Sequence, residues 1–372
     1  MDKRICFVLN YAPHYREAIF KKIDETFKCD FYFGDTIHTP LKKINYKVLK
    51  GFKKELKTIR LTKIYNWQFG VFFIILKKYD YYIITGDISY VSNWFLILYC
   101  NIFRKKIFLW CHGLKDKPVN KTQRRISKLF YGSKMNELLL YGNYSREIML
   151  KEGFDKNKLH VLYNSLDSER QIVLRNKLSV SKMNPLKDYF KNNDPVLIYI
   201  GRLQEEKKLE MIIEAQNRLL IENFNVNSVF VGEGEMRNKL ESLATKYKIQ
   251  GKVWFYGACY DDEIIAPLIY NASLTISPGN VGLTAIHSLA FGTPVITHNN
   301  FAKQMPEFEA IIDGKTGSFF EENNISDLVD KIKSWLPILK ENREKIRKDC
   351  YERIDTYYNT EYQITLLKSL MK

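Results

Sequence analysis

Short, near-continuous apolar runs alternate with segments of helical length along the whole chain, and this alternation constrains the fold most. The runs are rich in β-branched or aromatic residues, and nearly all end at glycine, asparagine or another polar residue. Buried parallel strands joined by crossover helices have this pattern. The first half holds six runs, ICFVLN, CDFYFG, YYIITG, IFLWCHG, ELLLYG and LHVLYNS. The second half holds six more, VLIYIGRL, SVFVGEG, VWFYGA, LTISPG, PVITHN and GSFF.

The domain organisation follows from length and from this grouping. At 372 residues the chain is too long for one ordinary core. The polar stretch 167–194 separates the two sets of runs and predicts an interdomain linker. The sequence therefore predicts an α/β protein with two Rossmann-like, doubly wound domains, 1–166 and 195–350. Residues 351–372 are predicted to form a helical segment that can pack back on the N-terminal domain. Ligands bind beyond the carboxyl ends of such strands, so two facing domains would share one cleft.

Positive charge is concentrated in the first half of the chain. Residues 1–200 carry 37 Lys and Arg against 18 Asp and Glu, a net +19, whereas residues 201–372 carry 21 against 24, a net −3. The stretch Leu41–Lys63 is especially basic. It is compatible with a solvated surface, or with attraction to membrane headgroups or nucleic acid. Interleaved bulky apolar residues favour the membrane, and the sequence contains no recognised nucleic-acid-binding module.

The spacing of the cysteines and the length of the apolar windows indicate the cellular compartment in which the protein is expected. No C-x-x-C pair occurs, which argues against a zinc site or a disulfide framework and fits a reducing cytosol. The start of the chain does not resemble a signal peptide. The windows FGVFFIIL and WFLILYCNIF are shorter than the ~20 residues that a spanning helix needs. We therefore expect a cytoplasmic protein, peripheral on the inner face of the cell membrane. The cysteines are Cys6, Cys29, Cys100, Cys111, Cys259 and Cys350.

Two turns in the second half indicate an anion site. Gly201-Arg202 directly follows the run VLIYI, and Lys207 comes shortly after. An arginine fork with a nearby ammonium at a strand's carboxyl end suits a diphosphate, although a solvated basic loop has the same composition. After LTIS, Gly282-Leu283-Thr284 begins a helix whose first N–H groups lack intrahelical partners and attract anions. His287 lies one turn into this helix.

The order of these motifs resembles the carboxyl-terminal domain of glycosyltransferase family 4, retaining enzymes of the two-Rossmann-domain (GT-B) architecture. The motifs concerned are GRLQEEKK, VGEGE, VWFYGACYDDEI, LTISPG, GLTAIHSLAFGTPVI and EAIIDGKTGSFF. In the first half, NYAPHYREAIF, WCHG and KLHVLYNSLD are similar to the family's first loop, cleft histidine and interdomain signature. The resemblance keeps motif order over nearly the whole chain and is to the bacterial surface-polysaccharide type.

The resemblance implies roles for residues on the donor side. Arg202 and Lys207 match the pair that grips the donor's diphosphate. The helix start at Gly282 matches amides on the distal phosphate and the sugar, and the loop at Gly257 matches one that flanks the nucleobase. The donor-binding candidates are Gly201, Gly257, Ala258, Gly282, Leu283, Thr284 and His287.

Three further residues are implied in the first half. His112 matches the histidine placed near the donor sugar, and with Arg202 and Lys207 it is a catalytic candidate. His14 and Arg16 lie in the first loop, on the acceptor side. The resemblance implies a nucleotide sugar as co-substrate and a glycan or lipid-linked oligosaccharide as acceptor. Because cationic side chains and helix amides would meet the phosphate charge, no metal or other cofactor is expected.

The sequence departs from the family at two positions. The family usually has two glutamates separated by seven residues, the first on the sugar hydroxyls and the second on the ribose. Alignment on Gly282-Leu283 puts Gly279 and His287 in their places. A histidine can hydrogen-bond a ribose hydroxyl, or it can pack on its own helix. The loss of the first glutamate leaves the donor sugar open and removes a carboxylate nucleophile from that position.

The expected function is a retaining glycosyltransferase of surface polysaccharide biosynthesis, such as capsule or lipopolysaccharide synthesis. Two alternatives remain open. One is a sugar-nucleotide epimerase of the same architecture, which would need acid/base carboxylates in the cleft. The other is a non-catalytic nucleotide-sugar-binding module, against which the retention of Arg202 and Lys207 speaks. The nucleotide, sugar, acceptor, linkage, catalytic base and oligomeric state are not given by the sequence.

Other polar residues have structural interpretations. Asp261-Asp262-Glu263 precedes the apolar segment EIIAPLIYN, where acids favour a helix N-terminus, so we interpret it as a cap and not as a metal site. His38, His160 and His298 are interpreted as surface or strand-end residues.

Overall fold

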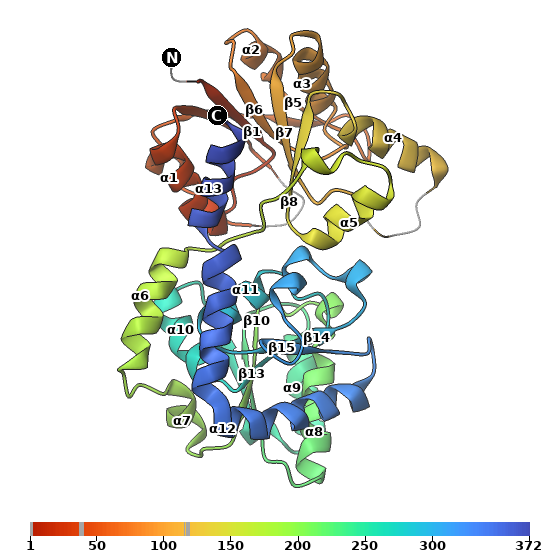
Figure 1. Cartoon of the computed structure of the whole chain (residues 1–372). Coiled ribbons are helices and arrows are strands. Elements are labelled where there is room, and N and C mark those ends of the chain that lie inside the picture. The colour runs from red at the N-terminus through yellow and green to blue at the C-terminus, as the bar shows by residue number, and fades with distance from the viewer. Residues whose placement is uncertain (1–2, 37–40, 115, 117–119) are drawn as a thin grey trace. The chain divides into compact units, whose positions relative to one another are not determined.

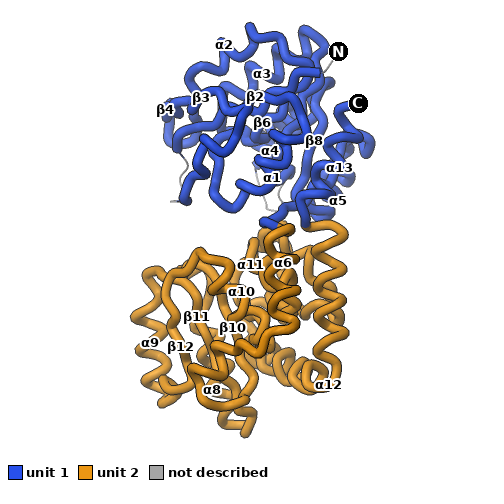
Figure 2. The backbone as a smooth tube through the Cα atoms, turned by 90° about the vertical axis from the view of Figure 1, so that its left-hand side faces the viewer, with its two compact units in different colours: residues 1–167, 359–372 blue, residues 168–358 orange. Residues whose placement is uncertain are grey.

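The computed structural model divides the chain into two compact units (Figure 2). Residues 1–167 and 359–372 form unit 1, and residues 168–358 form unit 2. Each unit is built around one parallel sheet, which confirms the two Rossmann-like α/β domains expected from the apolar runs. The structure describes residues 3–36, 41–114, 116 and 120–372, so His38 lies outside the described residues.

Unit 1 contains a seven-stranded parallel sheet in the order β3-β2-β1-β6-β7-β8-β9 (Figure 1). Its strands are β1 (Ile5–Leu9), β2 (Cys29–Gly34), β3 (Phe52–Leu56), β6 (Tyr81–Thr85), β7 (Lys106–Cys111), β8 (Asn136–Leu140) and β9 (Leu159–Val161). Side chains along β1 alternate between two cores, with Phe7 and Leu9 on one face and Cys6 and Val8 on the other. Burial on both faces explains why these strands are continuous apolar runs in the sequence.

Helices cover both faces of this sheet. They are α1 (Glu17–Thr26), α2 (Val71–Ile75), α3 (Val91–Ile102), α4 (Lys121–Tyr131), α5 (Asn143–Lys151) and α13 (Thr360–Leu370). The last helix, α13, packs beside α1, and its Ile364 and Leu367 are buried in the same core as Phe7. Gln363 of α13 also donates to the Tyr163 carbonyl at 3.1 Å. The C-terminus is therefore part of unit 1.

Three strands of unit 1 were not expected from the sequence. β3 has the sequence FKKEL and pairs only with β2, at the edge of the sheet. Its Lys53 and Lys54 are exposed, as is typical of an edge strand that must not pair further. β4 (Thr58–Arg60) and β5 (Asn66–Gln68) form a separate antiparallel hairpin. These strands contain polar and charged residues and so lack the continuous apolar run from which the other strands were predicted.

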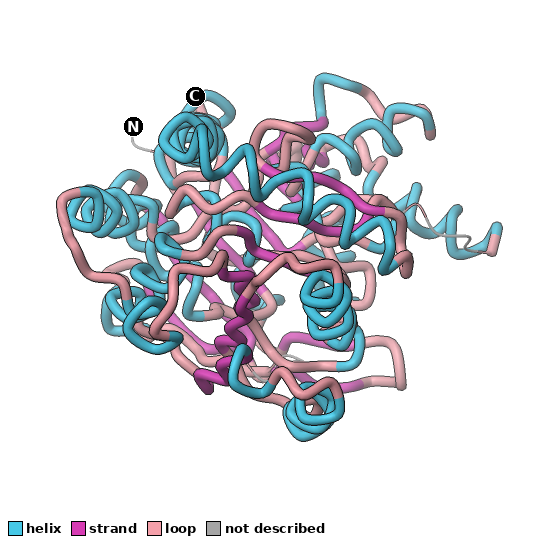
Figure 3. Tube along the Cα trace, turned by 90° about the horizontal axis from the view of Figure 1, so that it is seen from below, coloured by secondary structure: helices cyan, strands magenta, loops and turns pink. Residues whose placement is uncertain are grey.

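Unit 2 contains a six-stranded parallel sheet in the order β12-β11-β10-β13-β14-β15. Its strands are β10 (Val196–Ile200), β11 (Asn227–Val231), β12 (Val253–Gly257), β13 (Leu274–Ser277), β14 (Val295–His298) and β15 (Gly317–Phe320). Its helices are α6 (Ser168–Ser179), α7 (Pro185–Phe190), α8 (Glu210–Ile221), α9 (Arg237–Lys246), α10 (Asp262–Asn271), α11 (Leu283–Ala290) and α12 (Ile325–Tyr357). Figure 3 colours the helices, strands and loops of the chain by secondary structure.

The stretch 167–194, expected as a linker, contains two helices of unit 2. Leu174 and Leu178 of α6 and Leu186 of α7 are buried in a core with Ile198 of β10. The polar composition of the stretch reflects the outer faces of these helices, since their apolar side chains are widely spaced.

Strand order reverses at one point in each sheet. In unit 1 the chain returns after β3 to pair β6 with β1, and in unit 2 it returns from β12 to pair β13 with β10. The loops that leave the two central strands at such a point diverge and leave a crevice at the carboxyl edge. We therefore expect ligand sites at the loops that follow β1 and β6 in unit 1 and β10 and β13 in unit 2.

Candidate functional site

The loops after β10 and β13 lie against each other at the reversal point of unit 2. Gly201 and Arg202 follow β10, and residues 278–282 follow β13. The Gly279 N–H donates to the Lys207 carbonyl at 3.0 Å, so the two loops are directly bonded. Thr284 Oγ1 donates to the Ile200 carbonyl at 2.8 Å and fixes the start of α11 to the end of β10. The structure thus brings these sequence-predicted residues together.

Lys207 is held inside this junction. Its Nζ donates to the Asn280 carbonyl at 2.9 Å and also to the Asn280 side chain. Burial lowers the pKa of Lys207, and the nearby charge of Arg202 acts in the same direction. Arg202 itself is exposed, and within the described part of the chain its guanidinium makes no hydrogen bond or ion pair. An anion at this edge would therefore meet one half-buried ammonium and one exposed guanidinium.

The start of α11 is open to a ligand. Gly282 has a φ of +52°, a left-handed conformation that favours glycine, and a Cβ at this position would lie 3.9 Å from its nearest neighbour, Met305 Cγ. Val281 N–H is already bound to Gln304 Oε1 at 2.9 Å. The N–H groups of Leu283 and Thr284 have no acceptor inside the helix and carry its positive dipole end.

Gly279 shows why a glutamate is missing from the β13–α11 loop. A Cβ at this position would lie 2.3 Å from the Glu206 carbonyl oxygen and 2.7 Å from Lys207 Cα. Both are backbone atoms of the loop that carries Lys207, so they cannot move aside as a flexible side chain would. The close approach that places Lys207 beside Asn280 excludes any side chain at residue 279.

His287 lies on α11 and faces the first residue of α10. Its Nε2 is 3.4 Å from Asp262 Oδ1, and its side chain is only 14% exposed. Burial opposes ionisation of Asp262, but the hydrogen bond and charge of His287 outweigh it and lower the pKa of the Asp262 carboxyl. Asp261 caps α10 by accepting from the Glu263 N–H at 3.0 Å, which confirms the capping interpretation. His287 therefore presents a histidine–carboxylate pair, which sequence reasoning missed because Asp262 comes from another helix.

Gly257 ends β12 and Ala258 follows it, and β11 separates this strand from β10. Gly257 has a φ of +96°, and the Glu233 carboxylate lies 3.5 Å from where its Cβ would be. Gly232 and Gly234, by contrast, have packing roles, because a Cβ on either would fall within 2.3 Å of a carbonyl in the loop after β10. The loop at Gly257 is thus near the edge of the site and apart from Lys207.

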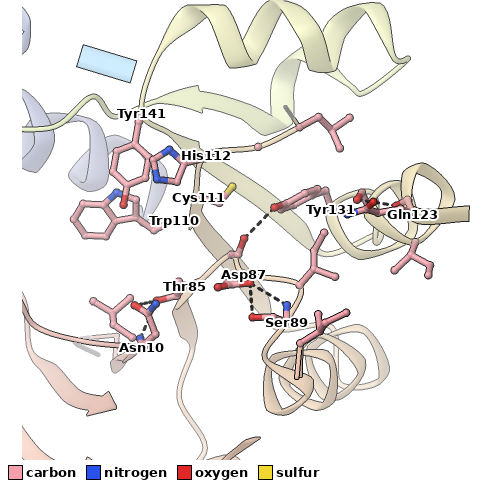
Figure 4. A pocket seen from close by; sticks show the side chains of 18 of the residues that line it. Asn10, Thr85, Asp87, Ser89, Trp110, Cys111, His112, Gln123, Tyr131 and Tyr141 are labelled. Atoms are coloured by element: carbon pink, nitrogen blue, oxygen red, sulfur yellow. Dashed lines mark hydrogen bonds between the residues drawn. The ribbon is translucent and has the colours of Figure 1, made fainter. Parts of the chain in front are cut away.

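Unit 1 has a cavity of about 830 Å³ at the carboxyl edge of its own sheet (Figure 4). Residues after four neighbouring strands line it: Asn10 follows β1, Asp87 follows β6, His112 follows β7 and Tyr141 follows β8. Large, mostly preformed hollows with a few convergent polar groups are the usual form of small-molecule sites.

Arg16 and His112 meet on one wall of this cavity. Arg16 donates to the Tyr141 hydroxyl and lies over the Trp110 ring, with its guanidinium carbon 4.8 Å from the ring centroid. The His112 ring is 4.6 Å from the Tyr141 ring, and the two lie side by side in Figure 4. His14, the other first-loop candidate, is not among the lining residues.

The opposite wall was missed by sequence reasoning. Asp87 accepts from the Ser89 N–H at 2.9 Å and from its hydroxyl at 2.8 Å, and Tyr131 donates to the Gly86 carbonyl at 3.0 Å (Figure 4). The sequence does contain a pattern from which Asp87 could have been predicted. Asp87 follows the apolar run YYIIT, and residues that follow parallel strands lie at the same edge of the sheet, where His112 also lies. Aromatic faces, a carboxylate and a guanidinium around one hollow suit a polyhydroxylated ligand.

The family comparison concerns unit 2. Residues 185–353 match the family model described as glycosyl transferases group 1. A Methanocaldococcus jannaschii protein described as an uncharacterized glycosyltransferase is 27% identical over 303 residues, 77% of this chain and 65% of that protein. This chain spans about a third of the length of the first curated relatives that it matches.

Solved structures resemble the whole chain. HepE of Anabaena, crystallised with UDP, has a TM-score of 0.72 and 14% identity, and the alignment covers 99% of this chain and 99% of HepE. A glycosyltransferase of Rickettsia africae has a TM-score of 0.71 and 16% identity, over 99% of this chain and 97% of that one. At such identities the likeness establishes the fold, which is that of two-Rossmann-domain glycosyltransferases.

Proposed function

We propose that this chain is a glycosyltransferase that moves a sugar from a nucleotide-diphosphate sugar to a hydroxyl acceptor. The observation that carries the proposal is the junction of Lys207, Arg202 and the α11 start at the reversal point of the second sheet. Group 1 glycosyl transferases match this same part of the chain, and neighbours of the fold have been crystallised with UDP.

The chemistry requires stabilisation of a departing diphosphate. The bond between the sugar's C1 and the distal phosphate oxygen breaks, and negative charge develops on that oxygen. Lys207, Arg202 and the free amides of α11 would meet this charge with groups already in place. In the retaining course that we propose, the acceptor oxygen bonds to C1 from the same face, and its proton passes to the departing phosphate oxygen.

We assign the acceptor to the cavity of unit 1. Its aromatic wall and Asp87 offer stacking and hydrogen bonding to a glycan, and the exposed ring of His112 is the candidate for contact with the reacting sugar. We also propose a place in surface polysaccharide synthesis at the inner face of the membrane. The basic first half of the chain supports this location.

A turnover assay tests the proposal. The full chain would be incubated with sugar nucleotides, with and without oligosaccharide acceptors, and products would be followed by mass spectrometry and NMR. We expect acceptor-dependent release of nucleoside diphosphate and a product with the donor's anomeric configuration. An epimerised sugar nucleotide formed without acceptor would indicate the epimerase, and tight donor binding without turnover on any acceptor would indicate the binding module.

Catalysis is expected to be independent of added metal, because protein cations and amides already face the phosphate site. We predict that transfer rates stay unchanged in excess EDTA. The check is a rate measurement on chelator-treated protein, before and after addition of magnesium or manganese. Activity that disappears with the chelator and returns with the metal would contradict the prediction.

His287 is expected to contact the donor together with Asp262. We predict that His287→Ala raises the donor KM about fivefold, as for a hydrogen bond worth about 1 kcal/mol, with a smaller effect on kcat. His287→Gln should keep most of the affinity. His287→Glu should not, because it would place a second carboxylate against Asp262. Donor saturation curves for the three variants test this, and a Glu variant equal to the Gln variant would exclude the pairing with Asp262.

A further inference from the structure

An apolar surface covers the outer side of two helices in unit 1. α2 and α3 lie side by side (Figure 1), and their inner residues Val71, Ile74, Leu96 and Ile97 share one core. Their outer side chains have no such cover, with exposed fractions between 49% and 64%. We call this surface the apolar face, and it comprises Phe72, Phe73 and Leu76 of α2 and Phe95, Leu98 and Ile102 of α3.

The apolar face is not what an ordinary surface helix presents. A helix at the surface normally has a polar outer side. α3 has no charged residue, and its exposed positions 95, 98 and 102 form one stripe of large apolar side chains. Single exposed apolar residues are common, but a contiguous group of this kind marks an interaction surface. The β4–β5 hairpin extends it, since Trp67 of β5 packs edge-on against Phe95 with ring centroids 5.2 Å apart.

The charges around this face are mostly positive, although Asp80, just beyond α2, pairs with Lys105 at 3.8 Å. Residues 57–79 and 88–105, which include the hairpin and both helices, contain seven Lys and Arg and no Asp or Glu. Such a combination of apolar side chains with a basic surround is complementary to an anionic lipid surface, where apolar groups enter the acyl boundary and cations contact headgroups. A water-soluble acidic partner would not require the exposed phenylalanines.

The face continues to the mouth of the unit 1 cavity. Ile64 and Tyr65, in the turn between β4 and β5, are exposed and also line the cavity, as does the exposed Ile126 of α4. A ligand anchored in a bilayer that contacts the hairpin could therefore enter the cavity without leaving the membrane surface.

We propose that the apolar face and the β4–β5 hairpin insert into the interfacial layer of an anionic bilayer, and that a lipid-anchored acceptor reaches the cavity past Ile64 and Tyr65. The acceptor part rests on the proposed function, whereas the docking part does not. No helix in the described residues is long and apolar enough to cross a bilayer, so the contact proposed is with one leaflet.

This surface overlaps the basic stretch that the sequence singled out only at Lys57, Arg60 and Lys63. Lys53 of that stretch pairs with Asp30 at 3.3 Å, and the backbone N–H of Lys50 is bound by Asp24. Asp30 thus already compensates part of its charge, whereas residues 57–79 contain no acidic residue. Membrane attraction by charge alone would depend on the stretch, and insertion depends on the apolar face.

Vesicle flotation of the full chain tests the proposal. We expect binding to phosphatidylcholine vesicles that contain about one third phosphatidylglycerol, with part of it surviving high salt, because insertion is not screened. The double variant Phe72→Ser/Phe73→Ser should lower the partition coefficient roughly tenfold. The matched control is Ile221→Ser, which changes an exposed apolar residue of α8 and should bind as wild type. The triple glutamate variant at Lys50, Lys53 and Lys54, which lie outside the surface, should lose much less than the phenylalanine variant.

Other outcomes overturn the proposal or separate its parts. Unchanged flotation of the Phe72/Phe73 variant would overturn it, and so would self-association of wild type that this variant abolishes, since a second copy would then cover the face. Donor titration of the same variant should be unchanged. Vesicle binding without affinity for any sugar nucleotide would leave the docking intact and reject the proposed function. Equal transfer rates of the wild type and the variant on a vesicle-borne acceptor would reject the proposal that a lipid-anchored acceptor reaches the cavity past the β4–β5 hairpin.

Discussion

Replacement of Lys207 by alanine is expected to reduce donor affinity and transfer by about ten- to a hundredfold, the range for one charge-assisted hydrogen bond of about 1.5–3 kcal/mol. The half-buried ammonium joins the loop after β10 to the loop after β13 through Asn280. Its loss removes charge from the phosphate site and also frees the loop that precedes α11. Donor KM and kcat, measured with melting temperature, would report both effects.

Arg202→Ala is the matched comparison for Lys207→Ala. Arg202 is exposed and its guanidinium bonds to no described residue, so its removal should leave the melting temperature unchanged while it weakens donor binding. Loss of affinity in both variants, with loss of stability only for Lys207→Ala, would support the assignment. Unchanged kinetics in both would place the donor elsewhere.

Gly279→Glu is expected to destabilise unit 2 and abolish donor binding, although it introduces a carboxylate where the family that the sequence resembles usually has one. The new Cβ would lie 2.3 Å from the Glu206 carbonyl oxygen, and relief of that contact requires movement of the loop that holds Lys207. Overpacking against backbone costs roughly 1–3 kcal/mol or more. Thermal unfolding and donor titration of the purified variant are the measurements.

Two further variants separate the steric effect from the charge. Gly279→Ala carries the same Cβ and should be destabilised to a similar degree. Gly251→Glu places the same side chain at a glycine with nothing within 4 Å of a Cβ and should be close to neutral. A Gly279→Glu protein that is as stable as wild type and binds donor more tightly would show that the loops are not packed in this way.

The fold could be predicted because buried parallel strands leave a direct trace in the sequence. Cys6, Phe7 and Val8 are all apolar since β1 is covered on both faces. β3 could not be predicted in this way, because it is an edge strand with exposed lysines and has no continuous apolar run. Residues 168–194 were too polar to be recognised as the helices α6 and α7.

The residues of the candidate site could be predicted only where their position depends on the strand that precedes them in the sequence. Arg202, Lys207 and Gly282 lie in the segments that leave β10 and β13, so their place at the sheet edge is set by the strand pattern. The partner of His287 was not predictable, because Asp262 approaches from a different helix. The reason for glycine at residue 279 was also hidden, since it depends on a backbone contact with residues 206 and 207.

Calorimetric titration of the full chain with UDP-, GDP- and ADP-sugars, run in parallel on wild type and Arg202→Ala, is the sharpest test of the donor site. We expect saturable binding of at least one sugar nucleotide with one site per chain, weakened about tenfold or more in the variant. This expectation is contradicted if no sugar nucleotide binds the wild type, or if one binds both proteins with equal affinity.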